Sequence, residues 1–294
     1  MNEDFKNTIY KELFSHETIF WQRVNFNYRI LSSIKKSNKT IFLDYGCGWG
    51  FFIFCLAAFG AKKIIGIDIR KNEIEIAKKI KDAIFHDYDI QFYHRSTLDY
   101  QESIDVMFFN NVLSHVKLPV EYLMKAYSIL NYQGVISIYD NNNGLSLLVH
   151  YRNKRLWNRN EHELTKQREN IFMKNRLTAE KAQNYALMTR GLSEEDCLAL
   201  LNDTEENIET YLITRENVMP THWLDSDIVD ERIINPIIYK HILSDMGFEN
   251  IDLRSDSYNY PISSNILNKI GIGLFIYPAF HMTAEKRRLP LKKK

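Results

Sequence analysis

The fold is decided by the stretch Ile41-Phe42-Leu43-Asp44-Tyr45-Gly46-Cys47-Gly48-Trp49-Gly50. Its apolar residues and single acid predict a short buried strand. Three alternating glycines follow, and the apolar run from Phe51 to Phe59, closed by Gly60, predicts a helix. In α/β proteins, a strand that ends in a glycine-rich turn and opens a helix brings backbone amides against a ligand, because a Cβ would block close approach.

Two kinds of nucleotide-type ligand fit such a turn. The dinucleotide fingerprint places its third glycine one residue later, where this chain has Phe51. The pattern apolar-apolar-Asp-x-Gly-x-Gly-x-Gly instead resembles motif I of the class I S-adenosylmethionine-dependent methyltransferases. That resemblance implies an α/β, Rossmann-like methyltransferase fold, with a seven-stranded, mostly parallel sheet and helices on both faces. It also implies S-adenosyl-L-methionine as cofactor, S-adenosyl-L-homocysteine as product, and no metal.

The sequence after the turn fits the same family. Lys63–Asp68 predicts a second strand that ends in an acid, close to the expected distance of about 20 residues from the turn. The resemblance gives Asp68 the role of accepting both ribose hydroxyls of the adenosine. Asn72 and Glu75 predict a capping box at the start of a helix that ends near Ile84.

Three further strands are predicted at Ile90–His94, Ser103–Asn110 and Val135–Asp140. Family members carry an acid that contacts adenine just after strand three, and this chain has Ser96 there, followed by Thr97. The Ser96 hydroxyl can still bond the adenine amine, but a plain turn residue is almost as good an interpretation.

Strand four resembles the family's "FD-apolar-run" signature, and Asn111–Val116 resembles its common "NVLEHV" segment, followed by a helix from Pro119. The cofactor contacts that the resemblance implies are Asp44, Gly46, Cys47, Gly48, Gly50, Asp68, Ile69, Ser96, Thr97, Asn110 and Asn111. His115 stands near the expected position of the transferred methyl. It is a candidate catalytic base or substrate contact, and a structural hydrogen bond is the alternative.

The closing helix of such a domain begins only at Asn235-Pro236, so a long segment is inserted after strand five. Strands six and seven are expected at Glu249–Arg254 and Ile272–Tyr277. The predicted division is an N-terminal helical lid or sheet cover at 1–36, a cofactor-binding domain at 37–143 and 235–280, a helical substrate cap at 144–234, and a basic tail at 281–294. A solvated terminus is the preferred interpretation of that tail, over contact with RNA or acidic lipid.

The end of strand five carries Asp140-Asn141-Asn142-Asn143-Gly144, which suits a polyhydroxylated acceptor such as a sugar or, alternatively, a simple turn. Asp140 is therefore a catalytic candidate. The candidates for acceptor binding are Asn141, Asn142, His222 and Trp223.

Some methyltransferase subclasses are excluded by absent motifs. No Asp/Asn-Pro-Pro-Tyr follows strand four, and none of Cys47, Cys55 and Cys197 follows a proline, as the nucleophile of cytosine-C5 enzymes does. The sequence favours an O- or N-methyltransferase acting on a small molecule, with a surface-glycan precursor preferred. An RNA- or protein-directed enzyme and a non-catalytic cofactor-binding protein remain alternatives.

The composition limits which binding partners and which cellular location we expect for this protein. The 294 residues carry a formal net charge of +1, which predicts no strong attraction to nucleic acid or membranes. The odd number of cysteines matches no disulfide or zinc spacing, and neither a signal-peptide pattern nor a membrane-length apolar run is present. We expect a soluble cytoplasmic protein with a small-molecule acceptor, and we leave open whether it forms a homodimer.

Overall fold

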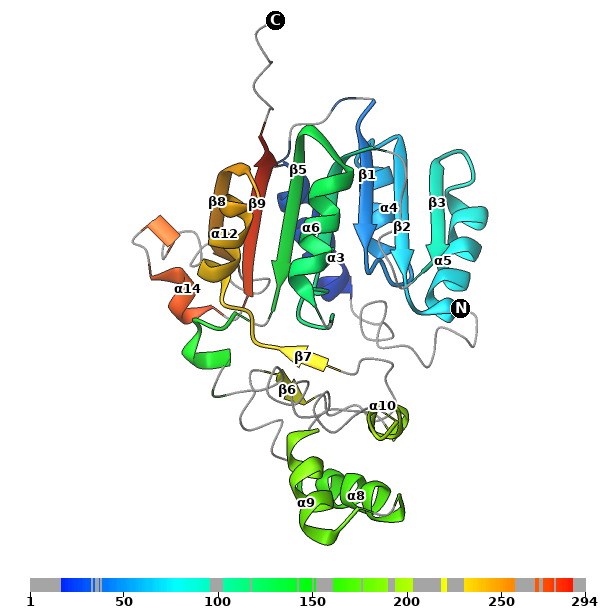
Figure 1. Cartoon of the computed structure of the whole chain (residues 1–294). Helices are drawn as coiled ribbons and strands as arrows, with labels where there is room; N and C mark the ends of the chain where they lie inside the picture. Colours follow the sequence, from blue (N-terminus) through cyan, green and yellow to red (C-terminus); the bar gives the residue numbers. More distant parts are fainter. Residues whose placement is uncertain are drawn as a thin grey trace, which may run out of the picture.

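The structure is a computed structural model whose elements are shown in Figure 1. It describes residues 17–32, 34, 37, 39–95, 103–116, 118–141, 143–149, 151, 161–175, 177–189, 194–202, 218–220, 230–256, 268–269, 272–277 and 279–287.

A seven-stranded sheet forms the centre, in the order β3-β2-β1-β4-β5-β9-β8 (Figure 1). The first five strands in this order are parallel, whereas β9 is antiparallel to both of its neighbours. This arrangement confirms the predicted fold class. The strands span Ile41–Tyr45 (β1), Lys63–Asp68 (β2), Asp89–His94 (β3), Ile104–Asn110 (β4), Leu130–Asp140 (β5), Phe248–Asp256 (β8) and Ala279–Lys286 (β9).

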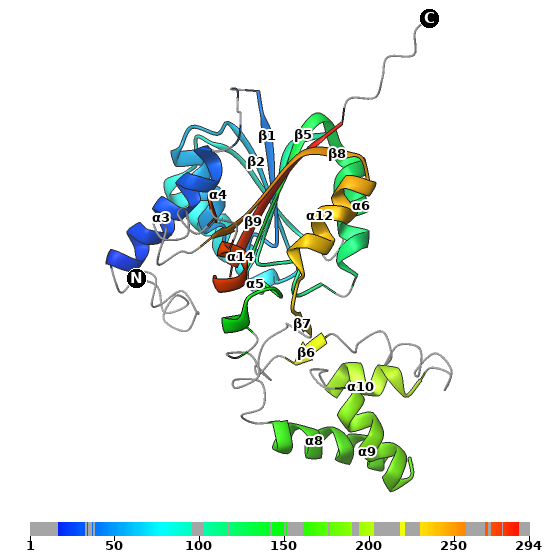
Figure 2. The same ribbon diagram turned by 90° about the vertical axis from the view of Figure 1, so that its left-hand side faces the viewer.

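Helices cover both faces of the sheet (Figure 2). The helices are α3 (Glu17–Ser32), α4 (Phe51–Ala58) and α5 (Lys71–Ile84) on one face, and α6 (Pro119–Ile129) and α12 (Pro236–Asp245) on the other. Buried side chains of α3, among them Phe26, Ile30 and Leu31, belong to the same core cluster as α4. The helix predicted in 1–36 therefore covers the sheet over its described part. A lid role stays a prediction, and residues 1–16 lie outside the described ranges.

The capping box predicted at Asn72 and Glu75 is wrong. Helix α5 begins at Lys71 with Arg70 as its N-cap, and the Arg70 side chain makes no capping hydrogen bond. The N–H of Arg70 instead donates to the Asp68 carboxylate at 2.8 Å. The acid at the end of β2 therefore fixes the start of the helix two residues earlier than the capping signal indicated, with Arg70 rather than Asn72 as the N-cap.

Strand β5 starts at Leu130, five residues before the predicted Val135. Leu130 pairs with Ile104, and the register then shifts until Val135 pairs with Val106. Residues 131–134 thus form an irregularity within the strand, where Gln133 has a φ of 65°.

The last two elements correct the predicted strand at Ile272–Tyr277. That segment contains a short helix, α14 (Gly273–Ile276), and the seventh strand is β9. The Asn143 amide donates to the carbonyls of Leu274 (2.7 Å) and Tyr277 (2.9 Å), which ties the helix to the end of β5. Strand β9 runs past the predicted domain end at 280 to Lys286.

Lys286 was expected in a solvated basic tail, but its side chain is buried. Its ammonium donates to the carbonyls of Tyr127 (2.6 Å) and Leu130 (2.7 Å), where α6 passes into β5. These bonds satisfy acceptors that the end of a helix leaves open. Residues 288–294 lie outside the described ranges.

The insertion after β5 contains α8 (Glu161–Lys174), α9 (Ala179–Met188), α10 (Glu194–Leu200) and a pair of short strands, β6 (Val218–Pro220) and β7 (Asp230–Arg232). Phe172, Ala182, Ala186 and Cys197 form a small core of its own. In Figures 1 and 2 these helices lie beyond the carboxyl ends of the parallel strands.

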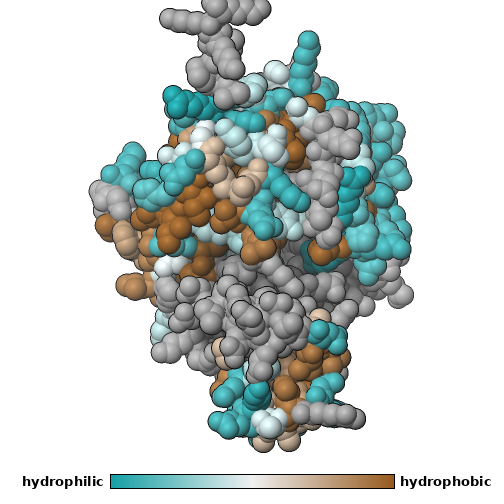
Figure 3. Space-filling view, viewed as in Figure 1, coloured by the Kyte–Doolittle hydropathy of each residue, from teal (hydrophilic) through white to brown (hydrophobic). Residues whose placement is uncertain are grey.

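Apolar side chains are exposed on the outer surfaces of α12 and α14, as the brown area on the left of Figure 3 shows. They include Ile237, Ile238 and Phe275. No helix in the described part of the chain combines the length and the hydropathy that a membrane crossing requires.

Candidate functional site

The turn between β1 and α4 needs glycine for two reasons. Gly46, Gly48 and Gly50 have φ angles of 77°, 54° and 87°, a region that other residues rarely adopt. A Cβ at Gly46 would also collide with the side chain of Val112, which follows β4. The turn is therefore packed closely against the end of the neighbouring strand.

The backbone N–H groups of residues 46–50 all have partners inside the chain. Gly46 and Cys47 donate to the carbonyl of Ile67, at 2.7 and 3.1 Å, and Gly50 donates to the carbonyl of Cys47 at 3.0 Å. Gly48 donates to the carboxylate of Asp68 at 2.7 Å, and Trp49 donates to the carboxylate of Glu73. A dinucleotide pyrophosphate needs such groups free. The turn is thus not built as an anion-binding site.

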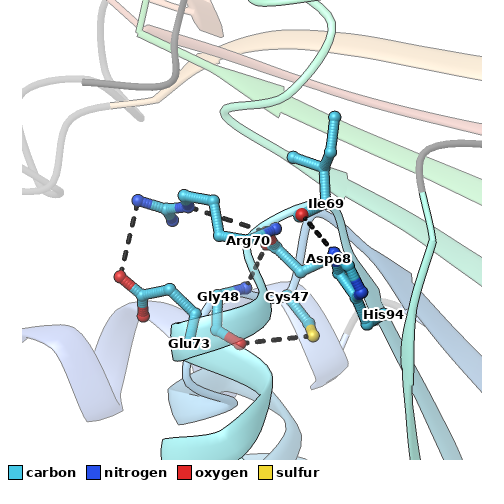
Figure 4. Close-up of polar contacts among 7 residues, drawn as sticks. All are labelled: Cys47, Gly48, Asp68, Ile69, Arg70, Glu73 and His94. Carbon is cyan, nitrogen blue, oxygen red and sulfur yellow. Dashed lines mark hydrogen bonds and ion pairs between the residues drawn. The ribbon is translucent and has the colours of Figure 1, made fainter.

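Asp68 joins the turn to the next helix (Figure 4). It is 5% exposed, and its two oxygens accept from the N–H groups of Gly48 and Arg70. The guanidinium of Arg70 lies 3.6 Å away from the same carboxylate. Each carboxylate oxygen has two lone pairs, so Asp68 can still accept from the hydroxyls of a ribose.

Glu73 is a member of this site that the sequence reasoning missed. Its Oε1 lies 3.4 Å from the Arg70 guanidinium, and its Oε2 is buried with no hydrogen-bond partner (Figure 4). Burial raises the pKa of Glu73, Arg70 and the Trp49 backbone lower it, and Asp68 raises it further. The available signal was an acid in the first turn of the helix after β2.

Asp44 lies on β1, which runs between β2, the strand that carries Asp68, and β4. It is 2% exposed, and within the described part of the chain it accepts one hydrogen bond, from the Asn110 amide at 3.3 Å. Burial and the charge of Asp68 raise its pKa well above the ordinary value, and Asn110 lowers it in part. Burial, Asp44 and Asp68 likewise raise the pKa of the Cys47 thiol.

The site therefore presents carboxylates and very few free donors. Asp44, Asp68 and Glu73 surround the turn, and the one guanidinium among them, that of Arg70, lies against Asp68 and Glu73. Within the described ranges, no group of three acidic, histidine or cysteine residues is arranged to hold a metal ion. Such a site fits a ligand with hydroxyl donors and positive charge, and S-adenosylmethionine has both.

The ends of β4 and β5 are fastened to each other. Asn111 has a φ of 54°, and its N–H donates to the carbonyl of Tyr139 at 2.8 Å. Its side-chain oxygen accepts from the N–H of Asn141 at 3.0 Å, and the Tyr139 hydroxyl donates to the Asn141 side chain at 2.8 Å. Asn111 and Asn141 thus meet at the mouth of the site, where Asn141 is exposed.

Asp140 supports the segment that carries His115. It is 1% exposed, and its carboxylate accepts from the N–H of Ser114 at 3.2 Å. The N–H of His115 donates to the carbonyl of Val112 at 2.9 Å, and its side chain is half-buried. Asp140 and His115 are therefore close in the fold, but the carboxylate is turned into the protein rather than toward solvent.

Comparison with known proteins decides the family. A model described as a methyltransferase domain matches residues 36–214, more than half of the chain. This chain belongs to the methyltransferase-domain family. The resemblance of the glycine turn to the class I, S-adenosylmethionine-dependent members is thereby confirmed, and the protein is an enzyme that uses S-adenosylmethionine. A search of curated proteins finds no significant match.

Solved structures share the fold of this methyltransferase at low identity. An S-adenosylmethionine-dependent methyltransferase from Mesorhizobium loti is 14% identical with a TM-score of 0.52, over 88% of this chain and 96% of its own. A protein from Listeria monocytogenes assigned to the same class is 15% identical with a TM-score of 0.52, over 89% and 97%. A protein from Haloferax volcanii assigned as a methyltransferase, solved with the Trm112 activator, is 12% identical with a TM-score of 0.51, over 98% and 99%.

Not every predicted site residue of the methyltransferase is described. Ser96, Thr97, Asn142, His222 and Trp223 lie outside the described ranges. Ile69 does lie beside Asp68, with its side chain 59% exposed, and its carbonyl accepts from the His94 imidazole at 2.8 Å (Figure 4).

Proposed function

We propose that this methyltransferase transfers the methyl group of S-adenosylmethionine to a hydroxyl or amine of a small molecule, with a sugar or surface-glycan precursor as the preferred acceptor. The observation that carries the cofactor part is the acidic turn, whose N–H groups are all used within the chain. The acceptor part rests on the polar mouth formed by Asn141 and the nearby His115.

The cofactor-binding residues are assigned by their place in the site. Asp68 takes the ribose hydroxyls, Ile69 offers an exposed apolar side chain to the adenine, and Asp44 and Asn110 lie at the other end, near β4. The remaining contacts are Gly46, Cys47, Gly48, Gly50 and Asn111. Ser96 and Thr97, outside the described ranges, are assigned from the sequence alone.

When bound, S-adenosylmethionine would supply an electrophilic methyl group on its sulfonium, to which the acceptor oxygen or nitrogen would bond in line as S-adenosylhomocysteine leaves as a thioether. The protein's main task is alignment of the nucleophile, because correct positioning lowers such a barrier strongly. His115 is assigned to take the proton that a hydroxyl or amine loses. Asp140 acts as its positioning residue, since it holds the N–H of Ser114 beside it.

The insertion at 144–234 is assigned as the acceptor cap. Its helices α8–α10 lie beyond the carboxyl ends of the strands, where open α/β sheets bind ligands (Figures 1 and 2). Its two ends are held together at the base, where the Gly144 N–H donates to the Ile234 carbonyl at 2.6 Å. Asn142, His222 and Trp223 remain the proposed acceptor contacts.

A cytoplasmic location is also proposed. It is supported by Cys47, Cys55 and Cys197, which are buried and form no disulfide, as in proteins of a reducing compartment.

The decisive experiment is an acceptor screen that detects S-adenosylhomocysteine release. The panel contains nucleotide sugars and other glycan precursors, small amines, RNA and protein. Turnover with a sugar hydroxyl alone would support the proposal. Turnover only with RNA or protein would replace it, and cofactor binding without turnover on the whole panel would favour a non-catalytic binding protein.

A further inference from the structure

A group of large apolar side chains is exposed at one corner of the molecule, near the carboxyl end of β5. They come from three parts of the chain: the segment that follows β5, the start of α12, and α14. We name the group the apolar corner, and each of its residues is 40–76% exposed: Leu147, Leu148, Tyr151, Ile237, Ile238 and Phe275. Apolar residues scattered singly on a surface need no explanation, so what matters is whether these lie together.

Hydrogen bonds inside the fold hold the three parts of the corner together. The Ser146 hydroxyl donates to the Ile276 carbonyl at 3.0 Å, and the Asn143 amide donates to two further carbonyls of the α14 segment. The Gly144 N–H donates at 2.6 Å to the carbonyl of Ile234, just before α12 begins. The apolar side chains therefore gather on one surface, part of which is the brown area on the left of Figure 3. Such a surface marks an interaction with another protein or with a membrane.

The charges in the same three parts of the chain all have one sign. Asp and Glu are absent from the sequence at 141–160, 233–244 and 257–284. Lys240 on α12 and Lys269, shortly before α14, are exposed. The sequence has four more arginines and lysines at 152–159, which lie outside the described ranges. The net charge of +1 for the whole chain therefore averages over an uneven distribution, and the apolar corner is flanked by cations.

This combination of apolar and cationic groups favours one partner over two others. In a two-fold dimer a second copy of the chain would present the same surface, so cations would face cations. A nucleic acid would pair with the cations and leave the apolar side chains without a partner. A bilayer with anionic headgroups satisfies both, because apolar and aromatic side chains enter the boundary between headgroups and acyl chains while the headgroups attract lysine and arginine.

We propose that the apolar corner docks this methyltransferase on a membrane surface that carries anionic headgroups. The protein then lies on the bilayer and does not cross it. Leu147 follows Asn141 by six residues, and an extended chain spans at most about 3.6 Å per residue, so the docked surface lies within about 22 Å of the mouth of the site. Docking therefore brings the mouth of the site close to the headgroups, whichever acceptor the enzyme methylates.

The experiment is flotation of the full chain with lipid vesicles, from which the partition coefficient is obtained. One set of vesicles is pure phosphatidylcholine, and the other contains about one third of phosphatidylglycerol. We expect partition into the anionic vesicles to be stronger by at least about tenfold, because each lysine near an anionic surface contributes about fivefold. The difference should shrink as salt is added, since salt screens the attraction.

Two pairs of substitutions test the apolar side chains independently. The double variants Leu147→Gln with Leu148→Gln, and Ile237→Gln with Ile238→Gln, should each weaken partition into the anionic vesicles by at least about tenfold. Ile84→Gln is the matched control, because Ile84 is 66% exposed at the end of α5, which packs against β3 at the opposite edge of the sheet. It should leave partition unchanged. The melting temperature of each variant shows whether it is folded.

A separate substitution tests the charge. Lys240→Gln should weaken partition into the anionic vesicles by about fivefold and leave partition into phosphatidylcholine unchanged. Lys78→Gln, at an exposed side chain of α5, is its control and should change neither.

Four results would overturn the inference. They are absence of binding to either kind of vesicle, equal partition into both kinds, partition that both double variants leave unchanged, and a loss that Ile84→Gln reproduces. A wild-type protein that ignores vesicles but self-associates in sedimentation, and that the Leu147 and Leu148 substitutions make monomeric, would show that the corner joins two copies of the chain. None of these results bears on the proposed function, which depends on S-adenosylhomocysteine binding and on the acceptor screen.

Discussion

Gly48 and Asp68 are joined by a hydrogen bond of 2.7 Å, from the backbone N–H of the turn to the carboxylate at the end of β2. The acid that should hold the ribose therefore also holds the turn against which the cofactor lies. Because one carboxylate does both, the shape of the turn and the binding of the adenosine are linked. A substitution at Asp68 must be tested for both effects.

The first prediction concerns cofactor affinity. Asp68→Ala removes the acceptor of two ribose hydroxyls, and each bond to a charged acceptor contributes roughly 1.5–3 kcal/mol. We expect S-adenosylhomocysteine to bind at least about tenfold more weakly, measured by calorimetry. Asp68→Asn should lose less, since its amide oxygen can still accept from Gly48.

Asp105→Asn is the control, because it alters a carboxylate at the other end of the sheet. It should change the melting temperature without changing the affinity. Unchanged affinity in a folded Asp68→Ala protein would refute the ribose assignment, and binding of NADH in its place would revive the dinucleotide interpretation.

The second prediction tests the cap. His222→Ala and Trp223→Ala should weaken acceptor use, seen as a higher KM for the acceptor, and should leave the affinity for S-adenosylhomocysteine nearly unchanged. The reason is that the described cofactor-site residues lie on β1, β2, β4 and the segments that follow them. A parallel loss of both affinities would contradict the division of roles between the cap and the sheet.

The glycine turn and the strand that follows it could be predicted because their signals are local. Positive φ angles at Gly46, Gly48 and Gly50 strongly favour glycine, and the buried β2 requires a continuous apolar run that ends at Asp68. Asn235 was predictable as an N-cap for the same reason, and it accepts from the N–H groups of Ile237 and Ile238.

The wrong predictions arose where contacts between residues far apart in the sequence determine the local structure. The apolar segment before Tyr277 is equally compatible with a strand, and it forms a short helix because Asn143, far away in sequence, holds its carbonyls. Lys286 is held at the end of a strand because its ammonium donates to the carbonyls of Tyr127 and Leu130 at the end of α6. Asn143 belongs to the polar stretch 140–144, which suited either an acceptor or a simple turn, and in the fold it is fully buried.

The third prediction concerns acid stability. His281 is 1% exposed between β5 and β8, where burial, Arg254 and Arg29 lower its pKa to about 3. Arg254 can only donate to Nδ1 (3.1 Å), so Nε2 carries the hydrogen and donates to the Ser137 hydroxyl (2.9 Å). The fold thus requires the neutral ring.

The unfolded chain protonates this histidine near pH 6.5 and the folded chain only near pH 3. The contribution of His281 is therefore complete above pH 6.5 and declines by about 1.4 kcal/mol per pH unit as the pH falls between these values. His281→Gln keeps one donor and one acceptor and should flatten the fall of the unfolding free energy between about pH 7 and pH 5. His86→Gln, at an exposed side chain, should leave that fall as steep as in the wild type.

The last prediction concerns His115, which lies on the segment that Asp140 holds through Ser114. If its imidazole accepts the acceptor's proton, His115→Ala and His115→Gln should lower turnover by about 10²–10⁴-fold at saturating cofactor. A histidine that only fastens the segment would instead lower the melting temperature and leave turnover per folded molecule nearly unchanged. Folded fraction and turnover must therefore be measured separately, and the rate followed against pH. The variants should lose any limb of the pH–rate profile that the base causes, whereas Asp140→Asn should reduce turnover and keep that limb, because Asp140 only positions the segment. Near-normal turnover in both His115 variants would mean that alignment alone drives the reaction, with the proton lost to water.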